Sequence, residues 1–285
     1  MASYADLVPL FTVERVEGDG AVYRPVDGLP HDDDRLLGGL VLGLSLRSAA
    51  ATVDEDRRVH SLHGYFLRRG RSSQPLELVV DVLRDGRAFS VRRIAAEQNG
   101  VPIALFTASY VTGDADDDPT DWQRAPRGLP DPEAVTGPPP LVSTSSLLEA
   151  FDVRGAEPDD PDSSSAVHPY WARVRTALPD DPTLHASVVA LMSDCGVSAT
   201  ACGPGTSVRD QLATASLDHA IWFHRPVRTD EWMLVSGRSQ SDRARRGFAH
   251  AEIRAQDGRL VASIAQEALR VSRRRPRPEG AAEQA

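Results

Sequence analysis

Apolar and polar residues alternate along two long stretches of the chain, and each stretch follows a segment with helical spacing. In the first half the alternating runs cover residues 76–83, 88–98 and 102–111. Asp85-Gly86 and Asn99-Gly100 join these runs, and such dipeptides predict β-hairpins because both central positions of the turn favour φ > 0. Residues 36–53 before them place apolar side chains near the spacing of one helix face. We therefore expect one helix followed by an antiparallel meander.

The second half repeats this scheme. A helix is predicted over residues 182–201, and the alternating runs after it cover residues 216–223, 232–238, 248–255 and 260–271. The repetition extends to a motif, since Tyr65-Phe66-Leu67-Arg68 matches Trp222-Phe223-His224-Arg225 as aromatic, Phe, any residue, Arg. The two halves are therefore predicted to be copies of one unit.

A helix wrapped by a curved antiparallel sheet, present twice, is an α+β arrangement whose two sheets can join edge to edge. We expect the first unit over residues 1–112 and the second over residues 166–272. The segment between them, 113–165, is rich in Asp, Pro, Gly and Ser and predicts a linker, from which Leu147, Leu148 and Phe151 are candidates to dock on a domain. The tail, 273–285, is predicted to be disordered.

Charge and composition narrow the function. The net charge of −9 over 285 residues argues against nucleic acid as a partner. All 32 basic side chains are Arg, which excludes Schiff-base and P-loop lysines but leaves local sites for a phosphorylated ligand.

The cysteines and the hydropathy pattern further limit the possible cofactors and the possible location of the protein. The two cysteines, Cys195 and Cys202, are too few for a zinc site or a disulfide framework, so we expect them in the core and expect no metal and no cofactor. No apolar run approaches the roughly 20 residues of a membrane span, and the N-terminus lacks the pattern of a signal peptide. We therefore expect a cytoplasmic protein with no membrane partner.

The two copies differ at three polar positions. When the copies are aligned by their turns, Gln266 in the second falls opposite Ala108, and Ser216 falls near Val59. Gln266 lies in an apolar row, where an amide without hydrogen bonds would cost roughly 1–3 kcal/mol. Asp194 lies beside the apolar face of the second predicted helix, where a hydroxyl and an amide are suitable donors. Taken alone, Asp194 fits a solvated helix end and Gln266 fits a satisfied core amide, so only their joint position indicates a site.

Four stretches resemble the acyl-CoA thioesterase II family, in order along both halves. They are residues 59–68, 83–93, 216–226 and 256–267. The resemblance implies a double-hotdog fold and hydrolysis of acyl-CoA thioesters. It also implies a catalytic trio of Asp194, Ser216 and Gln266, which would hold one water molecule with Asp194 as the general base. These are the residues that distinguish the two copies.

The sequence departs from the family pattern at three places. Leu40 follows Gly38-Gly39 where the family usually has Gln, which removes a polar group near the path of the acyl or pantetheine chain. Arg69 replaces the usual Pro, and the segment after Asp194 is smaller and less aromatic than usual. Gly39 and Leu40 are thus expected near the substrate. Three arginines are candidates to pair with the phosphates of coenzyme A: Arg68, Arg225 and Arg246.

Two other functions stay open at this level. A hotdog hydratase or dehydratase resembles a different pattern, with an Asp-His pair at the helix start, whereas His31-Asp32-Asp33-Asp34 precedes the first helix here. A non-catalytic acyl-CoA-binding protein is consistent with Leu40. Asp218 and His219 are neighbours on one strand and point to opposite faces, so we expect structural roles for them. A homodimer or tetramer is expected, because hotdog sheets commonly join edge to edge.

Overall fold

A computed structural model describes residues 6–30, 34–113, 128–137, 146–156, 169–201 and 214–270. Its helices are α1 (Leu7–Leu10), α2 (Gly38–Ala50), the 3-10 helix η2 (Ser146–Ala150), α3 (Pro182–Asp194) and α4 (Val197–Thr200). The strands of the first half are β1 (Val13–Arg15), β2 (Ala21–Pro25), β3 (Arg57–Phe66), β4 (Glu77–Asp85), β5 (Phe89–Gln98) and β6 (Val101–Thr112). Those that follow are β7 (Phe151–Gly155), β8 (Tyr170–Val174), β9 (Thr214–Ser216), β10 (Asp218–Phe223), β11 (Met233–Arg243), β12 (Arg246–Ala255) and β13 (Leu260–Arg270).

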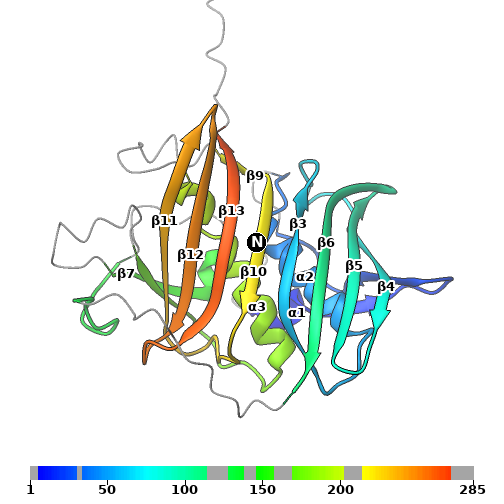
Figure 1. Ribbon diagram of the computed structural model, residues 1–285, viewed down its shortest axis with the longest axis horizontal. Coiled ribbons are helices and arrows are strands. Elements are labelled where there is room, and N and C mark those ends of the chain that lie inside the picture. The colour runs from blue at the N-terminus through cyan, green and yellow to red at the C-terminus, as the bar shows by residue number, and fades with distance from the viewer. Residues whose placement is uncertain are drawn as a thin grey trace, which may run out of the picture.

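In the described part of the chain the strands form one continuous sheet. Its order is β1-β2-β4-β5-β6-β3-β10-β13-β12-β11-β8-β7, with β9 added to β13. The two halves meet in the middle, where β3 and β10 run antiparallel with Leu62 opposite Ile221 (Figure 1). Each half contributes one long helix and an antiparallel meander, so the predicted α+β arrangement of two repeated units is confirmed.

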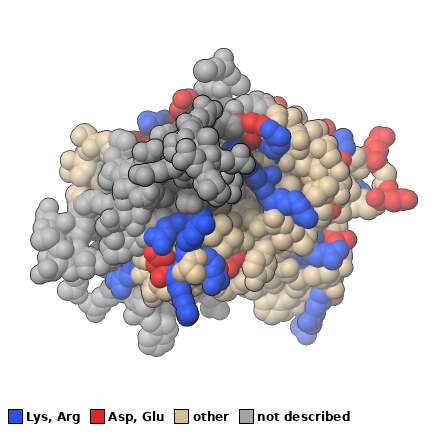
Figure 2. All heavy atoms as spheres, turned by 90° about the horizontal axis from the view of Figure 1, so that it is seen from above, with Lys and Arg blue, Asp and Glu red and all other residues tan. Residues whose placement is uncertain are grey.

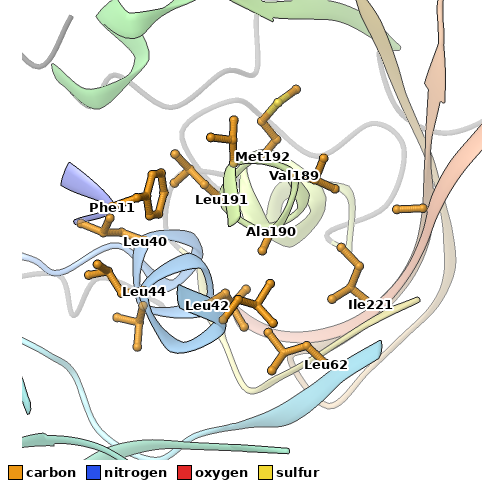
Figure 3. Close-up of a cluster of buried hydrophobic side chains, with 14 of the residues drawn as sticks. Phe11, Leu40, Leu42, Leu44, Leu62, Val189, Ala190, Leu191, Met192 and Ile221 are labelled. Atoms are coloured by element: carbon orange, nitrogen blue, oxygen red, sulfur yellow. The ribbon is translucent and has the colours of Figure 1, made fainter. Parts of the chain in front are cut away.

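The two long helices lie side by side against one face of the sheet. One hydrophobic core runs through both halves and includes residues of α2, α3, β3 and β10 (Figure 3). The helices approach closely because α2 presents glycine to α3. A Cβ atom added at Gly39 would lie 2.4 Å from the Leu191 carbonyl oxygen, so Gly39 has no room for a side chain.

The hairpin turns follow the prediction at one site and differ at two. Asn99 and Gly100 both have positive φ, 52° and 72°, as the tight turn requires. Asp85-Gly86 opens a longer loop instead, in which the Gly86 N–H donates to the Phe89 carbonyl oxygen and neither residue has positive φ. At Asp257-Gly258 only the glycine has positive φ. The dipeptides mark the hairpins correctly, but loop length decides the turn geometry.

The second helix is shorter than predicted. The expected helix over residues 182–201 divides into α3 and α4, because Cys195 takes an extended conformation and Gly196 has a φ of 93°. The break puts Asp194 at the last residue of α3, where its side chain reaches α2.

Part of the predicted linker is ordered and belongs to the second unit. Strand β7 pairs with β8 at the edge of the sheet, and Leu147 and Phe151 are buried in the core. Residues 128–137 pack on the other face, where the Trp171 indole donates to the Pro130 carbonyl oxygen and the Trp232 indole donates to Glu133. These few contacts were not predicted, because the segment as a whole has a polar composition.

Several predictions fall on residues outside the described ranges. These are the tail 273–285, Cys202, the side chain of Leu148, residues 31–33 and the remainder of the predicted linker. Among the helices of the described ranges, none combines the length and the apolar character that crossing a membrane demands.

Candidate functional site

Asp194 is the centre of a polar cluster built from four elements. Its carboxylate projects from the last residue of α3 and is only partly buried. Oδ2 accepts a hydrogen bond from the backbone N–H of Gly39 on α2, at 2.9 Å. Oδ1 accepts from the Ser216 hydroxyl of β9 at 2.9 Å and from the Gln266 amide nitrogen of β13 at 3.0 Å. The carboxylate therefore has three donors on its two oxygens, and the structure brings the predicted trio together.

Gln266 joins the other two members. Its amide nitrogen also donates to the Ser216 hydroxyl oxygen, at 2.6 Å, and its side chain is fully buried. The hydroxyl in turn donates to Asp194, so Ser216 both receives and gives a hydrogen bond within the cluster. Each member touches the other two, and this closed arrangement fixes all three side chains.

A second layer of polar residues supports Gln266 from behind. His219 of β10 is 1% exposed, and its Nδ1 lies 3.0 Å from Oε1 of Gln266. Its Nε2 lies 2.8 Å from the hydroxyl of Ser193, which is also buried. Burial lowers the pKa of His219 and favours the neutral ring. The neighbouring Asp218 accepts from the backbone N–H of Glu267 instead, so the two residues do face opposite sides of the sheet.

The contacts do not favour covalent catalysis by Ser216 or Cys195. The Ser216 hydroxyl donates to a carboxylate, whereas the imidazole of His219 contacts Ser193 and Gln266. Burial raises the pKa of Cys195 to about 12, and its thiol donates to the Leu191 carbonyl oxygen. A nucleophilic thiolate is therefore disfavoured at Cys195. Within the described ranges, no three His, Cys, Asp or Glu side chains converge as a metal site requires.

The start of α2 faces this cluster with an open helix end. Its N-cap residue, Leu37, makes no side-chain capping hydrogen bond, whereas Asp181 caps α3 through the N–H groups of Thr183 and Leu184. The first-turn N–H groups of a helix have no partner within the helix. Gly39 therefore joins the cluster through its backbone N–H, and its expected place near the substrate stays a prediction. Leu40 is 1% exposed and lies in the hydrophobic core with Phe11 (Figure 3).

The three arginine candidates lie at different distances from the Asp194 cluster. Arg68 and Arg225 occupy matching positions in the repeated motif, and each donates to a backbone carbonyl of its own copy, that of Pro102 or Leu260. This shared contact gives the repeated Arg a structural role. Arg225 follows the end of β10 opposite to Ser216, about 16 Å or more away at 3.3 Å per strand residue. Arg225 thus lies apart from the cluster, and its role as a substrate contact stays a prediction.

Arg68 and Arg246 lie at the same end of the sheet as the cluster. Arg68 follows Phe66, whose backbone N–H donates to the Leu217 carbonyl oxygen. Arg246 is opposite Leu269 on β13, next to the pair formed by Ala268 and Ser216. Arg246 also forms an ion pair with Glu267, at 3.3 Å.

Comparison with known proteins places the chain in a family. Residues 29–111 match a model described as the acyl-CoA thioesterase N-terminal domain, and residues 116–270 match one described as the acyl-CoA thioesterase C-terminal domain. Together the two matches cover most of the chain. The chain belongs to the acyl-CoA thioesterase family. The resemblance drawn from the sequence motifs is thereby confirmed.

Individual relatives agree with this family assignment. The chain is 33% identical to human acyl-coenzyme A thioesterase 8 over 82% of its own length and 80% of that protein. It is 30% identical to acyl-CoA thioesterase 2 of Haemophilus influenzae, over 82% and 87% of the two chains. A crystal structure of acyl-CoA thioesterase II TesB2 from Mycobacterium marinum superposes with a TM-score of 0.78 at 35% identity, covering 93% and 97%. The double-hotdog fold expected for this thioesterase family is confirmed.

Sequence reasoning missed the roles of His219 and Ser193. A signal for His219 was present, because the repeated motif sets it at the position of Leu62, as Gln266 is set at that of Ala108. Leu62 and Ala108 face each other across β3 and β6. The polar pair His219 and Gln266 thus replaces an apolar pair in the equivalent part of the second copy.

Proposed function

We propose that this acyl-CoA thioesterase hydrolyses its substrate with a water molecule held by Asp194, Ser216 and Gln266. The observation that carries the proposal is the partly exposed Asp194 carboxylate, fixed by three donors from α2, β9 and β13. A carboxylate held in this way can take a proton from water, and positioned base catalysis supplies roughly 10²–10⁴-fold. Family membership favours hydrolysis over a hydratase or dehydratase reaction.

The proposed reaction is a general-base hydrolysis of the thioester. Asp194 accepts a proton as the water oxygen attacks the thioester carbonyl carbon, and a tetrahedral oxyanion forms. The carbon–sulfur bond then breaks, and the proton on Asp194 passes to the leaving thiolate. The products are the free acid and coenzyme A. The Ser216 hydroxyl and the Gln266 amide orient the water and take no covalent part.

The oxyanion needs donors, and we propose the first turn of α2. Its N-cap residue, Leu37, makes no side-chain capping hydrogen bond. The Gly39 N–H of this turn donates to Asp194, which places the turn beside the proposed base. Helix N-termini favour negative charge because their N–H groups and dipole point toward it. Removing one oxyanion donor typically costs about 3–4 kcal/mol of transition-state stabilisation.

Release of coenzyme A from a series of short-chain to long-chain acyl-CoA esters tests the function. We expect turnover by the wild type and a fall of about 10³-fold in kcat for Asp194→Asn. Asp81→Asn is the matched control, because Asp81 pairs with Arg93 in the first copy, away from the site, and its loss should leave kcat unchanged. Binding of acyl-CoA without turnover by the wild type would instead support a non-catalytic binding protein. Turnover that survives in Asp194→Asn would contradict the assignment of the base.

We further propose that Arg68 and Arg246 contact the phosphates of coenzyme A. Both lie at the site end of the sheet, and basic side chains gather on the face seen from that end (Figure 2). Replacing either with Ala should raise KM for acyl-CoA but not for the matching N-acetylcysteamine thioester, which carries no phosphate. Arg225→Ala is the control, because Arg225 lies at the far end of β10. Equal increases in KM for both substrates would contradict the proposal.

The oligomeric state and the location of the enzyme stay predictions from the sequence. The convex face of the joined sheet exposes three large side chains near its centre, Tyr65, Leu105 and Trp222, and is available for a second copy. Sedimentation of the purified enzyme distinguishes a monomer from the expected homodimer or tetramer. Fractionation of cells that produce it tests the expected cytoplasmic location.

A further inference from the structure

Two buried polar side chains behind Gln266 have no task in the proposed hydrolysis. His219 and Ser193 are 1% and 0% exposed, and neither contacts the Asp194 carboxylate in the hydrogen-bond network. His219 instead lies between the Gln266 amide oxygen and the Ser193 hydroxyl, at 3.0 and 2.8 Å. A buried imidazole needs partners, but the first copy meets the same packing requirement with Leu62, also fully buried. Packing alone therefore does not explain a histidine at this position.

The direction of the Gln266 amide is decided by its neighbours. Asp194 can only accept, so the amide nitrogen must face it and the amide oxygen must point away. That oxygen then faces Nδ1 of His219, which must carry a proton to donate. If Nδ1 carried a lone pair, the amide would gain by turning over, and its oxygen would then face the carboxylate at 3.0 Å. The proton on Nδ1 removes this alternative.

Ser193 secures that tautomer. With Nδ1 protonated, a neutral His219 has a lone pair on Nε2, and the Ser193 hydroxyl can donate to it across 2.8 Å. The same hydroxyl lies 2.7 Å from the Ala190 carbonyl oxygen, so it can turn to that acceptor when the ring becomes doubly protonated. In both states Nδ1–H points at Gln266. Ser193 thus accommodates either charge state of the ring and leaves the proton on Nδ1.

We propose that His219 is a positioning residue for thioester hydrolysis, which holds the Gln266 amide nitrogen toward Asp194 and Ser216, and that Ser193 maintains the tautomer this requires. The inference rests on the proposed role of the Asp194–Ser216–Gln266 cluster. It assigns His219 no contact with substrate or water. The effect of His219 on kcat is exerted only through the Gln266 amide group.

The first test compares two replacements of His219. His219→Leu installs the residue found at the equivalent position of the first copy and removes the donor to Gln266. His219→Asn places a side-chain N–H near the former Nδ1 and keeps that donor. We expect kcat to fall about 10–100-fold in His219→Leu with KM within about threefold, and to stay within about threefold of wild type in His219→Asn. His250→Leu, a replacement of an exposed histidine on β12, should change neither constant.

Equal losses in the Leu and Asn variants, or no loss in either, would overturn the proposal. A double-mutant cycle with Gln266→Ala supplies the second test. If His219 acts through Gln266, His219→Leu lowers kcat in the wild-type background and has no further effect in the Gln266→Ala background. Multiplicative losses would show that His219 acts by another route and would equally overturn it.

The tautomer provides a measurement that does not depend on activity. Nitrogen-15 NMR of the ring should show His219 protonated at Nδ1 and unprotonated at Nε2 in the free enzyme. The opposite tautomer would contradict the proposed direction of the Gln266 amide. Asp194→Asn in the same kinetic series separates the two levels of inference. If Asp194→Asn abolishes hydrolysis and His219→Leu keeps the wild-type kcat, the catalytic role of the cluster is retained. Only the positioning role of His219 is then contradicted.

Discussion

The two ends of the α2–α3 helix pair are related by the duplication, and they differ in chemistry. At one end the N-cap residue of α2, Leu37, gives no side-chain cap, and Asp194 at the end of α3 accepts from the Gly39 N–H. At the other end the start of α3 is capped by Asp181, which also forms an ion pair with Arg47 of α2 at 2.6 Å. The second end therefore presents no comparable open helix start. The N–H groups of a helix start that carry no capping side chain are the ones a substrate oxyanion can reach.

The sheet repeats the same contrast. Leu62 and Ala108 face each other in the first copy and are fully buried, and His219 and Gln266 take these places in the second. When the two 13-residue helices are aligned from their first to their last residue, Ala49 and Ala50 correspond to Ser193 and Asp194. The first copy thus has apolar residues at the positions where the second carries the polar cluster. One copy carries the polar cluster, whereas the other fills the matching positions with side chains that need no hydrogen-bond partners.

Exchanging one residue between the copies should produce the largest effect. Gln266→Ala gives the second copy the residue of the first, and we expect kcat to fall about 10²–10³-fold because Asp194 and Ser216 lose the amide that fixes them. The reciprocal Ala108→Gln should create no second site and should lower the free energy of unfolding by about 1–3 kcal/mol, since Ala108 is fully buried and a larger side chain overfills its position. Steady-state kinetics and urea unfolding check the pair. If Ala108→Gln restored hydrolysis in an Asp194→Asn background, the conclusion that only the second copy can form the catalytic cluster would be contradicted.

Closing the space between the helices should have the next largest effect. In Gly39→Ala the new Cβ would lie 2.4 Å from the Leu191 carbonyl oxygen and 3.2 Å from Cβ of Asp194, so the helices must separate. We expect the free energy of unfolding to fall by about 1–3 kcal/mol, together with a loss of kcat. Gly28→Ala is the control, because a Cβ there would have no atom within 4 Å. Equal unfolding midpoints for the two variants would show that the close approach is not needed.

Restoring the apolar pair of the first copy should recover stability. Gln266→Ala leaves the buried Nδ1–H of His219 without its acceptor, which costs about 1–3 kcal/mol. The double variant His219→Leu/Gln266→Ala recreates the pairing of Leu62 with Ala108 and removes that unpaired group. We expect it to be more stable than Gln266→Ala alone by about 1–2 kcal/mol in urea unfolding, although it is catalytically impaired. A less stable double variant would mean that the two copies pack their sheets differently at this position.

The smallest effect concerns the hairpins. Ala244 and Arg245 connect β11 and β12 with positive φ values of 51° and 68°, a conformation that Asn99 and Gly100 supply more easily in the first copy. Ala244→Asn/Arg245→Gly should therefore raise the free energy of unfolding by about 1 kcal/mol. Asn99→Ala/Gly100→Arg should lower it by a similar amount. Thermal unfolding of both variants is the measurement, and activity should be unchanged in each.

The strands and the duplication could be predicted because they depend on local pattern. Alternating residues and turn dipeptides located β4, β5 and β6 after the first helix and all four long strands after the second to within a few residues, except that β11 extends to Arg243. They did not locate β3 (Arg57–Phe66). The same pattern could not place the end of α3 at Asp194, since a single extended residue, Cys195, ends the helix inside a run of suitable helix formers. It also could not find β7, whose few buried side chains lie within a polar segment.

The sequence by itself determined the two repeated units, the family, and the identity of Asp194, Ser216 and Gln266 as the polar differences between them. Only the tertiary structure decided how these residues act together. Asp194 and Gly39 are 155 positions apart, and their hydrogen bond depends on how α2 packs on α3. The roles of His219 and Ser193, and the separation of Arg225 from the cluster, follow from the register of β10 and β13. Periodicity reports which face a side chain occupies, whereas the partner it meets there is chosen by the packing of distant elements.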